Sequence, residues 1–257
     1  MGRKNAAYET LKWLLRKREV KIKAAIIGKD NAQKLRGLLK LKKIPIENRD
    51  QIEKKIKKGS LKADLGLSVL YREKIRAPII NNCKLGVINF HPAPLPDYKG
   101  NAGYNIAILK NLKEWAACAH YVDENFDTGP IIKNQKFKIN AFEETAFSLE
   151  KKTSQQIVRL FCDILSRLIA NPRKLSTKRN TGGIYISRQQ MERMKKILPS
   201  DNIDQKIRAF WFPPYSGAYI SLKGKNYTLV NDFILRSMAG SYLKVGDSSY
   251  TRSVSEA

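Results

Sequence analysis

The hydrophobic and polar positions of the first 91 residues alternate between a helical and a strand-like pattern. From Asn5 to about Arg18 the apolar residues recur at helical spacing, and the lysine-rich segments 30–44 and 49–60 show the same period. The apolar runs between and after them predict short strands at 20–28 (VKIKAAIIG), 44–46 (IPI), 63–71 (ADLGLSVLY) and 85–91 (LGVINFH). Helices that alternate with apolar strands are typical of a parallel sheet with helices on its faces.

The pattern changes after Pro96. Residues 101–112 show helical periodicity, and residues 115–139 form two strand-like runs around an acidic, glycine-containing loop. A long amphipathic helix is predicted from Glu144 to about Asn171, because Pro172 stops it. Beyond it, residues 207–235 alternate around a Gly-Lys-Asn turn, which predicts a hairpin.

These elements predict an α/β protein with a doubly wound, mostly parallel, Rossmann-like sheet and a small C-terminal β appendage. We expect a catalytic core over residues 1–175. A linker and a small β-rich, substrate-binding appendage would follow over residues 176–240, with a disordered tail over 241–257, which is polar.

The chain is strongly basic. Its 257 residues include 49 Lys and Arg against 23 Asp and Glu, a net charge of +26. Such a charge favours polyanionic partners, but the basic residues are spread along the chain and form no recognised nucleic-acid-binding motif. A nucleic-acid partner is therefore disfavoured, and a diphosphate-bearing small substrate would be attracted equally well. No apolar run is long enough to span a bilayer, no signal-peptide pattern opens the chain, and three scattered cysteines fit neither a zinc site nor a disulfide framework. We expect a cytoplasmic protein.

Candidate chemistry gathers where the strand at 85–91 ends. Asn89 and His91 lie two apart on extended chain, so their side chains share one side. Ligands of open parallel sheets collect beyond the carboxyl ends of such strands. The loop DENFDTG brings Asp127 as a carboxylate. An amide donor, a near-neutral base and a carboxylate are the groups needed for acyl transfer to an amine.

The same residues carry a family resemblance. The stretch NFHPAPLPDYKG (89–100), followed by DENFDTGPII (123–132), resembles the signature of the 10-formyltetrahydrofolate-dependent formyltransferases over about residues 20–150. The resemblance implies that 10-formyltetrahydrofolate is the formyl donor, that no metal is required, and that Asn89, His91 and Asp127 are catalytic. It also implies a pterin slot between residues 72–75 and 123–127. The candidate folate-lining residues are Arg72, Ile75 and Asp123.

Among the branches of that family, the chain looks most like the sugar N-formyltransferases, which act on nucleotide-linked aminosugars. The aromatic run FWFPPY (210–215) offers ring faces for a nucleotide base, with Arg208 beside it for a phosphate. The candidate substrate-binding residues are Lys99, Tyr104, Arg208, Trp211, Phe212 and Tyr215. The expected partners are a nucleotide sugar, dTDP-linked as the first candidate, and a second copy of the chain, since dimers are common among resembling proteins.

Two alternatives stay open. Methionyl-tRNA formyltransferases resemble this core and would explain the charge, but they usually carry a longer barrel-like C-terminal domain. A basic, non-catalytic binding protein on a decayed formyltransferase scaffold is the other.

The start of the chain raises a structural expectation. Resembling enzymes open with a strand before the first glycine turn and helix, and here the first strand is apparently missing before Gly2. Either the sheet closes differently, or the chain is shorter than the functional protein, and we favour the second. Such a chain would be poorly soluble and weakly active.

Overall fold

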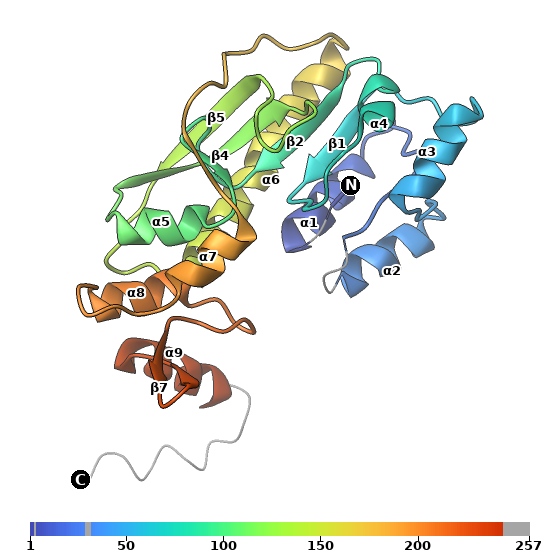
Figure 1. Cartoon of the computed structure of the whole chain (residues 1–257). Coiled ribbons are helices and arrows are strands. Elements are labelled where there is room, and N and C mark those ends of the chain that lie inside the picture. Colours follow the sequence, from blue (N-terminus) through green and yellow to red (C-terminus); the bar gives the residue numbers. More distant parts are fainter. Residues whose placement is uncertain (3, 29–31, 244–257) are drawn as a thin grey trace.

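The structure is a computed structural model that describes residues 1–2, 4–28 and 32–243. A central sheet carries helices on its faces, and the C-terminal segment lies at one end of it (Figure 1). The elements in chain order are α1 (Lys4–Leu14), α2 (Gln33–Leu41), α3 (Arg49–Lys57), β1 (Gly66–Val69), α4 (Ala77–Asn81), β2 (Val87–His91), β3 (Tyr98–Gly100), α5 (Gly103–Leu109), β4 (Glu114–Tyr121), β5 (Ile131–Lys138), α6 (Ala146–Ala170), β6 (Ile184–Ile186), α7 (Arg188–Met194), α8 (Ile203–Phe210), β7 (Tyr219–Leu222), β8 (Lys225–Thr228) and α9 (Asp232–Leu243).

The main sheet has the strand order β1-β2-β4-β5. β1 is parallel to β2, whereas β4 is antiparallel to both β2 and β5. On the side of β1, isolated parallel bridges extend the sheet through Gly2, then Ile27, and then from Ala25 to Ile46. The predicted α/β fold with a mainly parallel sheet is confirmed.

The central strand β2 is sandwiched between apolar layers. Ile88 and Phe90 are fully buried, and the Phe90 ring lies 4.9 Å from the ring of Phe161 on α6. α6 begins at a capping box in which Thr145 and Ser148 satisfy each other's backbone N–H groups. Its buried face and that of α1 cover one side of the sheet. The functional ends of β1 and β2 are thus fixed on a packed core.

The segments 20–28 and 44–46 are extended, as predicted, but form only isolated bridges instead of regular strands. Regular strands do not form because the position between residues 20–28 and β1, where the first strand was expected, is only partly filled. Met1 and Gly2 occupy one end of it: Gly2 N–H donates to Ile26 O at 3.1 Å, and Val69 N–H donates to Met1 O at 3.0 Å. Two residues cannot pair the full length of their neighbours, so no continuous ladder forms there.

The C-terminal segment differs in part from the expectation. The predicted hairpin is present as β7 and β8, joined by Lys223 and Gly224. However, α7, α8 and the start of α9 also lie within 176–240, so the expected β-rich appendage carries more helix than strand. α8 packs against α5 because the face carrying Ile207, Ala209 and Phe210 is buried. Of the predicted tail, 241–243 end α9, and 244–257 lie outside the described residues.

The first part of that segment packs on the core. Lys178 exchanges backbone hydrogen bonds with Ile131, and β6 pairs in parallel with β3. The segment from 176 to 186 therefore belongs to the core and not to a linker.

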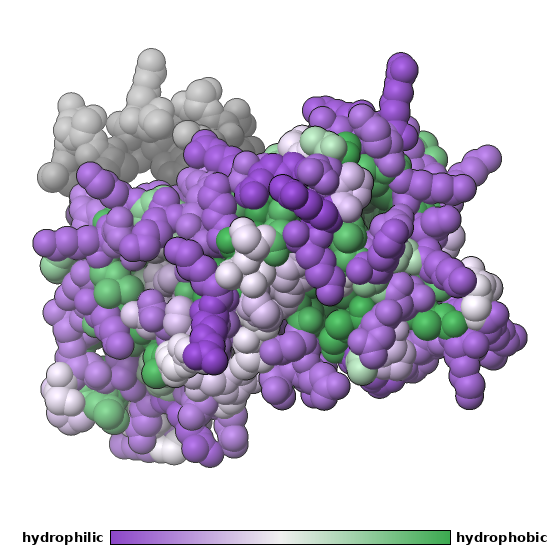
Figure 2. Space-filling model, turned by 90° about the horizontal axis from the view of Figure 1, so that it is seen from above, coloured by the Kyte–Doolittle hydropathy of each residue, from purple (hydrophilic) through white to green (hydrophobic). Residues whose placement is uncertain are grey.

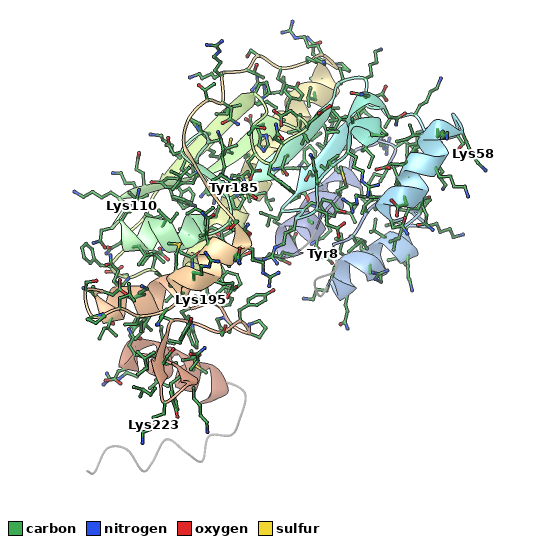
Figure 3. All side chains as sticks on the ribbon, viewed as in Figure 1. Tyr8, Lys58, Lys110, Tyr185, Lys195 and Lys223 are labelled. Atoms are coloured by element: carbon green, nitrogen blue, oxygen red, sulfur yellow. The ribbon has the colours of Figure 1, made fainter. Side chains whose placement is uncertain are left out.

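Basic side chains are distributed over the whole surface. Hydrophilic residues cover most of the face in Figure 2, with smaller apolar areas between them. Lys58, Lys110 and Lys223 project from three separate parts of the molecule: the ends of α3 and α5 and the hairpin (Figure 3). None of the described helices has the length and apolar character that a membrane crossing requires.

Arg208 on α8 joins the C-terminal segment to the core. It is 6% exposed, and its guanidinium donates to Asp204 at 3.0 Å and to the carbonyls of Ala141 and Glu144 at 2.5 and 3.1 Å. Replacing it by methionine (Arg208→Met) leaves two carbonyls without a donor, so we expect a loss of about 2–3 kcal/mol in the free energy of unfolding, measured in urea. Arg36→Met, at an exposed arginine on α2, is the control and should stay within about 0.5 kcal/mol of the parent. Equal effects of both substitutions would contradict this role.

Candidate active site

The predicted catalytic residues lie at the carboxyl end of β2, beside a cavity of ≈ 420 Å³. Its walls come from the end of β1, the loop after β2, the loop that carries Asp127, and the C-terminal segment. Tyr185 and Lys195 mark the C-terminal wall in Figure 3. Asn89, His91 and Asp127 all line this cavity, so the structure brings the predicted catalytic residues together.

His91 is held with one ring nitrogen occupied. Its Nε2 lies 2.9 Å from the carbonyl oxygen of Tyr98, which can only accept, so Nε2 carries a hydrogen. Its Nδ1 lies 3.4 Å from Oδ1 of Asp127. In the neutral ring, Nδ1 is therefore the basic atom, and a proton that it receives is stabilised by the carboxylate.

Asp127 is the electrostatic centre of the site. Its Oδ2 accepts the Gly100 N–H at 2.9 Å, and its Oδ1 faces both His91 and Nε2 of His120, the latter at 3.6 Å. Burial opposes ionisation, but the Gly100 donor and the positive charge that the two histidines carry when protonated outweigh it, so the pKa of the Asp127 carboxyl lies well below its usual range. The carboxylate is ionised across the neutral range.

Burial dominates at His91. Removal from water lowers the pKa of the His91 imidazole below 6.5, against the raising influence of Asp127. His91 is therefore neutral at pH 7, which is the state that a general base needs.

His120 is a site residue that the sequence analysis missed. It lies on β4 directly opposite Asn89 in the antiparallel register. Its Nδ1 donates to the carbonyl of Tyr121 at 2.7 Å, so in the neutral ring Nε2 accepts, and Asn89 Nδ2 donates to it at 3.0 Å. This bond fixes the Asn89 amide and leaves its second N–H for a ligand. The spacing of His120, seven residues before Asp127 on a predicted neighbouring strand, was the available signal.

The backbone around Asp127 is tightly constrained. Asp127 has a φ of 57°, in the left-handed region that costs free energy for a residue other than glycine. Asn180 donates from Nδ2 to the carbonyls of Asp127 and Gly129 at 2.9 and 2.8 Å. A Cβ at Gly129 would lie 1.9 Å from the Tyr121 carbonyl oxygen, so only glycine fits. The predicted acidic turn holds its carboxylate by these contacts.

Of the three predicted folate-lining residues, one lines the cavity and two do not. Arg72 lines the cavity. Ile75 instead packs its side chain into an apolar cluster with Ile52 and Ile79, and Asp123 accepts from Thr128 Oγ1 at 2.6 Å and from Asn125 N–H at 3.1 Å. The side chain of Ile75 therefore packs in the core, and that of Asp123 stabilises its own loop. Neither residue lines the cavity.

Of the six predicted substrate-binding residues, three line the cavity and three do not. Tyr104, Phe212 and Tyr215 line the cavity. Lys99 does not, and its Nζ donates to the Gly182 carbonyl at 2.6 Å. Arg208 does not line the cavity either, and its guanidinium donates to Asp204 and two main-chain carbonyls.

Trp211 likewise packs against the apolar cluster of the C-terminal segment, outside the cavity lining. Its neighbours Phe212 and Tyr215 do line the cavity, and their rings lie 5.9 Å apart.

Basic residues that the sequence did not single out line the same cavity. Lys4, Arg188 and Lys195 are among the lining residues; Lys195 is 6% exposed and pairs with Glu192 at 2.7 Å. Lys4 pairs with Glu150 at 3.0 Å and lies 4.6 Å from the centre of the Phe212 ring. Cations and aromatic rings thus line the same cavity as the acid–base group.

The fold and the site together define an α/β enzyme equipped for acyl transfer, with an amide donor, a neutral histidine and a buried carboxylate at the end of the central strand. No group of three or more His, Cys, Asp or Glu within the described residues is arranged to hold a metal ion. The chain belongs to the formyl transferase family, whose N-terminal domain matches residues 14–165.

Individual relatives agree with this family. The chain is 29% identical over 184 residues to GDP-perosamine N-formyltransferase of Brucella melitensis biotype 1, a match covering 68% of this chain and 67% of that protein. It is 27% identical over 183 residues to methionyl-tRNA formyltransferase of Staphylococcus epidermidis, covering 70% of this chain and 58% of that protein. Its fold resembles the N-formyltransferase of Helicobacter canadensis, solved with folinic acid and dTDP-3-aminofucose (TM-score 0.67, 24% identity, 91% of this chain and 87% of that one).

The balance between burial and the Asp127 charge can be measured at His91. We expect the His91 imidazole to titrate below pH 6.5 by NMR, because burial destabilises the imidazolium. Asp127→Asn removes the anion that favours the imidazolium, so the midpoint should fall further. With two histidines in the chain, His120→Gln assigns the signals. A parent midpoint at or above 6.5 would contradict the assignment of His91 as a neutral base.

Proposed function

We propose that this protein transfers the formyl group of 10-formyltetrahydrofolate to the amine of a nucleotide-linked aminodeoxysugar. The observation that carries the proposal is the Asn89–His91–Asp127 cluster in a cavity that is also lined by basic and aromatic side chains. Such side chains complement a nucleotide diphosphate, and the cluster complements an amine and a carbonyl.

The cavity fits two small substrates that meet at the cluster. Its volume of ≈ 420 Å³ lies within the range of about 300–1,000 Å³ of ligand pockets. Asn89 keeps one N–H available, because only its other hydrogen is engaged by His120. The end of β1, with Leu70, Tyr71 and Arg72, forms the wall on which the folate would lie. The folate supplies an activated formyl carbonyl.

Each catalytic side chain has one role in this reaction. The free N–H of Asn89 hydrogen-bonds the formyl oxygen and stabilises the charge that develops there as the amine attacks. Nδ1 of His91 takes the proton from the attacking amine, and the Asp127 carboxylate at 3.4 Å stabilises the imidazolium that forms. The imidazolium then returns this proton to the folate nitrogen as the bond between that nitrogen and the formyl carbon breaks, so tetrahydrofolate leaves and the formamide of the sugar is formed. The buried position of His91 excludes water from that proton transfer.

The acceptor is proposed from the basic and aromatic side chains of the cavity. Arg188 and Lys195 provide positive charge for a diphosphate, and Phe212 and Tyr215 provide faces for a base. A dTDP-linked sugar is the first candidate, supported by the likeness to a structure holding such a sugar, and a GDP-linked sugar is the second, supported by the perosamine relative. The alternative acceptor, a charged tRNA, requires a continuous basic surface, whereas the basic residues here are dispersed along the chain.

The direct test is incubation of the protein with 10-formyltetrahydrofolate and a panel of dTDP- and GDP-linked aminosugars, read by mass spectrometry. We expect the mass gain of one formyl group on one of them. His91→Ala should lower kcat by about 10²–10⁴-fold and Asn89→Ala by about 10²–10³-fold, with circular dichroism unchanged. Their combination should be far from additive. Formylation of methionyl-tRNA with no sugar product, or near-full activity of His91→Ala, would overturn the proposal.

The aromatic wall can be tested separately. Tyr215→Ala should raise the KM for the nucleotide sugar about tenfold or more, because stacking on a base contributes about 1–3 kcal/mol. The KM for the folate should hardly change. Trp211→Ala is the matched control: it packs outside the cavity lining, so it should lower stability more than it changes either KM. A larger KM effect from Trp211→Ala than from Tyr215→Ala would contradict this placement.

A further inference from the structure

Residues 178–186 form one extended segment beside the catalytic site, which we call the strap. It lies between α6 and α7, beyond the residues 14–165 that match the family, and ends in β6. Figure 1 shows the chain running from the end of α6 down to α7 along this path. At its start, Lys178 exchanges backbone hydrogen bonds with Ile131 on β5. The strap is therefore anchored to the main sheet before it reaches the site.

The strap contacts the turn that carries the acid. Nδ2 of Asn180 donates to the carbonyls of Asp127 and Gly129 at 2.9 and 2.8 Å, and Asn180 is only 9% exposed. One buried amide thus holds both ends of a turn in which Asp127 has a φ of 57°. A residue stays in the left-handed region only when its surroundings fix it there. Asn180 supplies such a constraint from outside the turn.

The strap also supports the groups that hold the histidine and the carboxylate. β6 pairs in parallel with β3. From β3, the carbonyl of Tyr98 accepts from Nε2 of His91, and the N–H of Gly100 donates to Oδ2 of Asp127. Both partners of the acid–base pair are therefore held by a strand that the strap covers, and one of them also by Asn180.

The strap approaches the loop after β2 so closely that one position requires glycine. A Cβ at Gly183, whose φ is 73°, would lie 1.7 Å from the carbonyl oxygen of Pro96. A Cβ at Gly182, whose φ is 80°, would meet no described atom within 4 Å. The two adjacent glycines share a positive φ and differ in this contact.

We propose that the strap is a positioning element for the proton transfer and that Asn180 is its main positioning residue. Asn180 acts through Asp127, because it holds the turn so that Oδ1 stays 3.4 Å from Nδ1 of His91 and Oδ2 stays on the Gly100 N–H. The effect on turnover rests on the proposed function. The geometry of the pair does not, since it can be measured without substrate.

The first test is Asn180→Leu, which nearly keeps the size of the side chain and removes both N–H donors. Because Asp127 is then no longer fixed beside His91, the midpoint of the His91 imidazole in an NMR titration should fall by about half a pH unit or more. Exchange of the Gly100 amide should become about tenfold faster or more. With substrates, kcat should fall about tenfold or more while both KM values hardly change.

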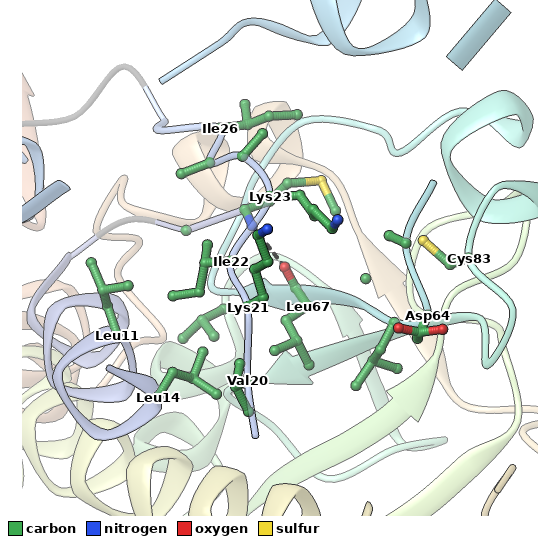
Figure 4. A pocket seen from close by; sticks show the side chains of 18 of the residues that line it. Leu11, Leu14, Val20, Lys21, Ile22, Lys23, Ile26, Asp64, Leu67 and Cys83 are labelled. Atoms are coloured by element: carbon green, nitrogen blue, oxygen red, sulfur yellow. Dashed lines mark hydrogen bonds between the residues drawn. The ribbon is translucent and has the colours of Figure 1, made fainter. Parts of the chain in front are cut away.

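The control for a general loss of stability is Leu14→Ala. Leu14 lines a separate cavity of ≈ 640 Å³ (Figure 4), so truncating it should lower the melting temperature. The His91 midpoint and the exchange of the Gly100 amide should stay at the values of the parent. Equal changes in Leu14→Ala and Asn180→Leu would overturn the proposal, and so would an unchanged midpoint and exchange rate in Asn180→Leu.

The second test separates the contact of the strap from its backbone strain. Gly183→Ala and Gly182→Ala both place a Cβ at a positive φ, so both should lower the melting temperature. Only Gly183→Ala also pushes the strap away from Pro96, so it should lower the His91 midpoint further, and kcat about tenfold further, than Gly182→Ala does. Equal effects of the two substitutions would overturn the proposal. If the parent formylates no aminosugar, the proposed function fails, and the titration and exchange measurements still decide this inference.

Discussion

A carboxylate that must stay ionised inside the protein organises this site. Asp127 loses its hydration when the loop after β4 folds back, and an uncompensated buried charge would be prohibitive. Gly100 from β3 supplies a main-chain donor, and His91 and His120 supply the facing rings. These groups come from β2, from β4 and from the loop between β2 and α5. The segments that surround the cavity therefore converge on one negative charge.

That Asn89, His91 and Asp127 come together was predictable because their geometry is local. Asn89 and His91 need only a strand and its alternation, and Asp127 needs only a tight acidic turn with Gly129. His120 was not predictable from its own strand, since its role follows from the β2–β4 register that sets it opposite Asn89. Its ring then decides which way the Asn89 amide points. Register between strands is a long-range property, so a local pattern cannot supply it.

Arg208 and Trp211, by contrast, lie outside the cavity lining. Arg208 and Trp211 were selected because their side chains suit a phosphate and a base. In the folded chain, Arg208 meets main-chain carbonyls and Trp211 meets an apolar cluster. Chemical suitability does not distinguish residues on the buried face of α8 from those on the cavity wall. The strands at 20–28 and 44–46 show the same limit, because an apolar run becomes a regular strand only when neighbours pair along its length.

The pairing of β6 with β3 bears on how such proteins can diversify. β6 lies beside Lys99 and Gly100, and Gly100 is the donor to Asp127. A recombination that exchanged everything after the long helix α6 would replace β6, the strand that pairs with β3. It would thereby disturb the hydrogen bond between Gly100 and Asp127. A crossover placed after Ile186 would exchange the helices and the hairpin while leaving the contacts of Asp127 with Gly100 and His91 untouched. If related proteins exchange C-terminal segments and so acquire new acceptor substrates, their recombination junctions should therefore lie after β6.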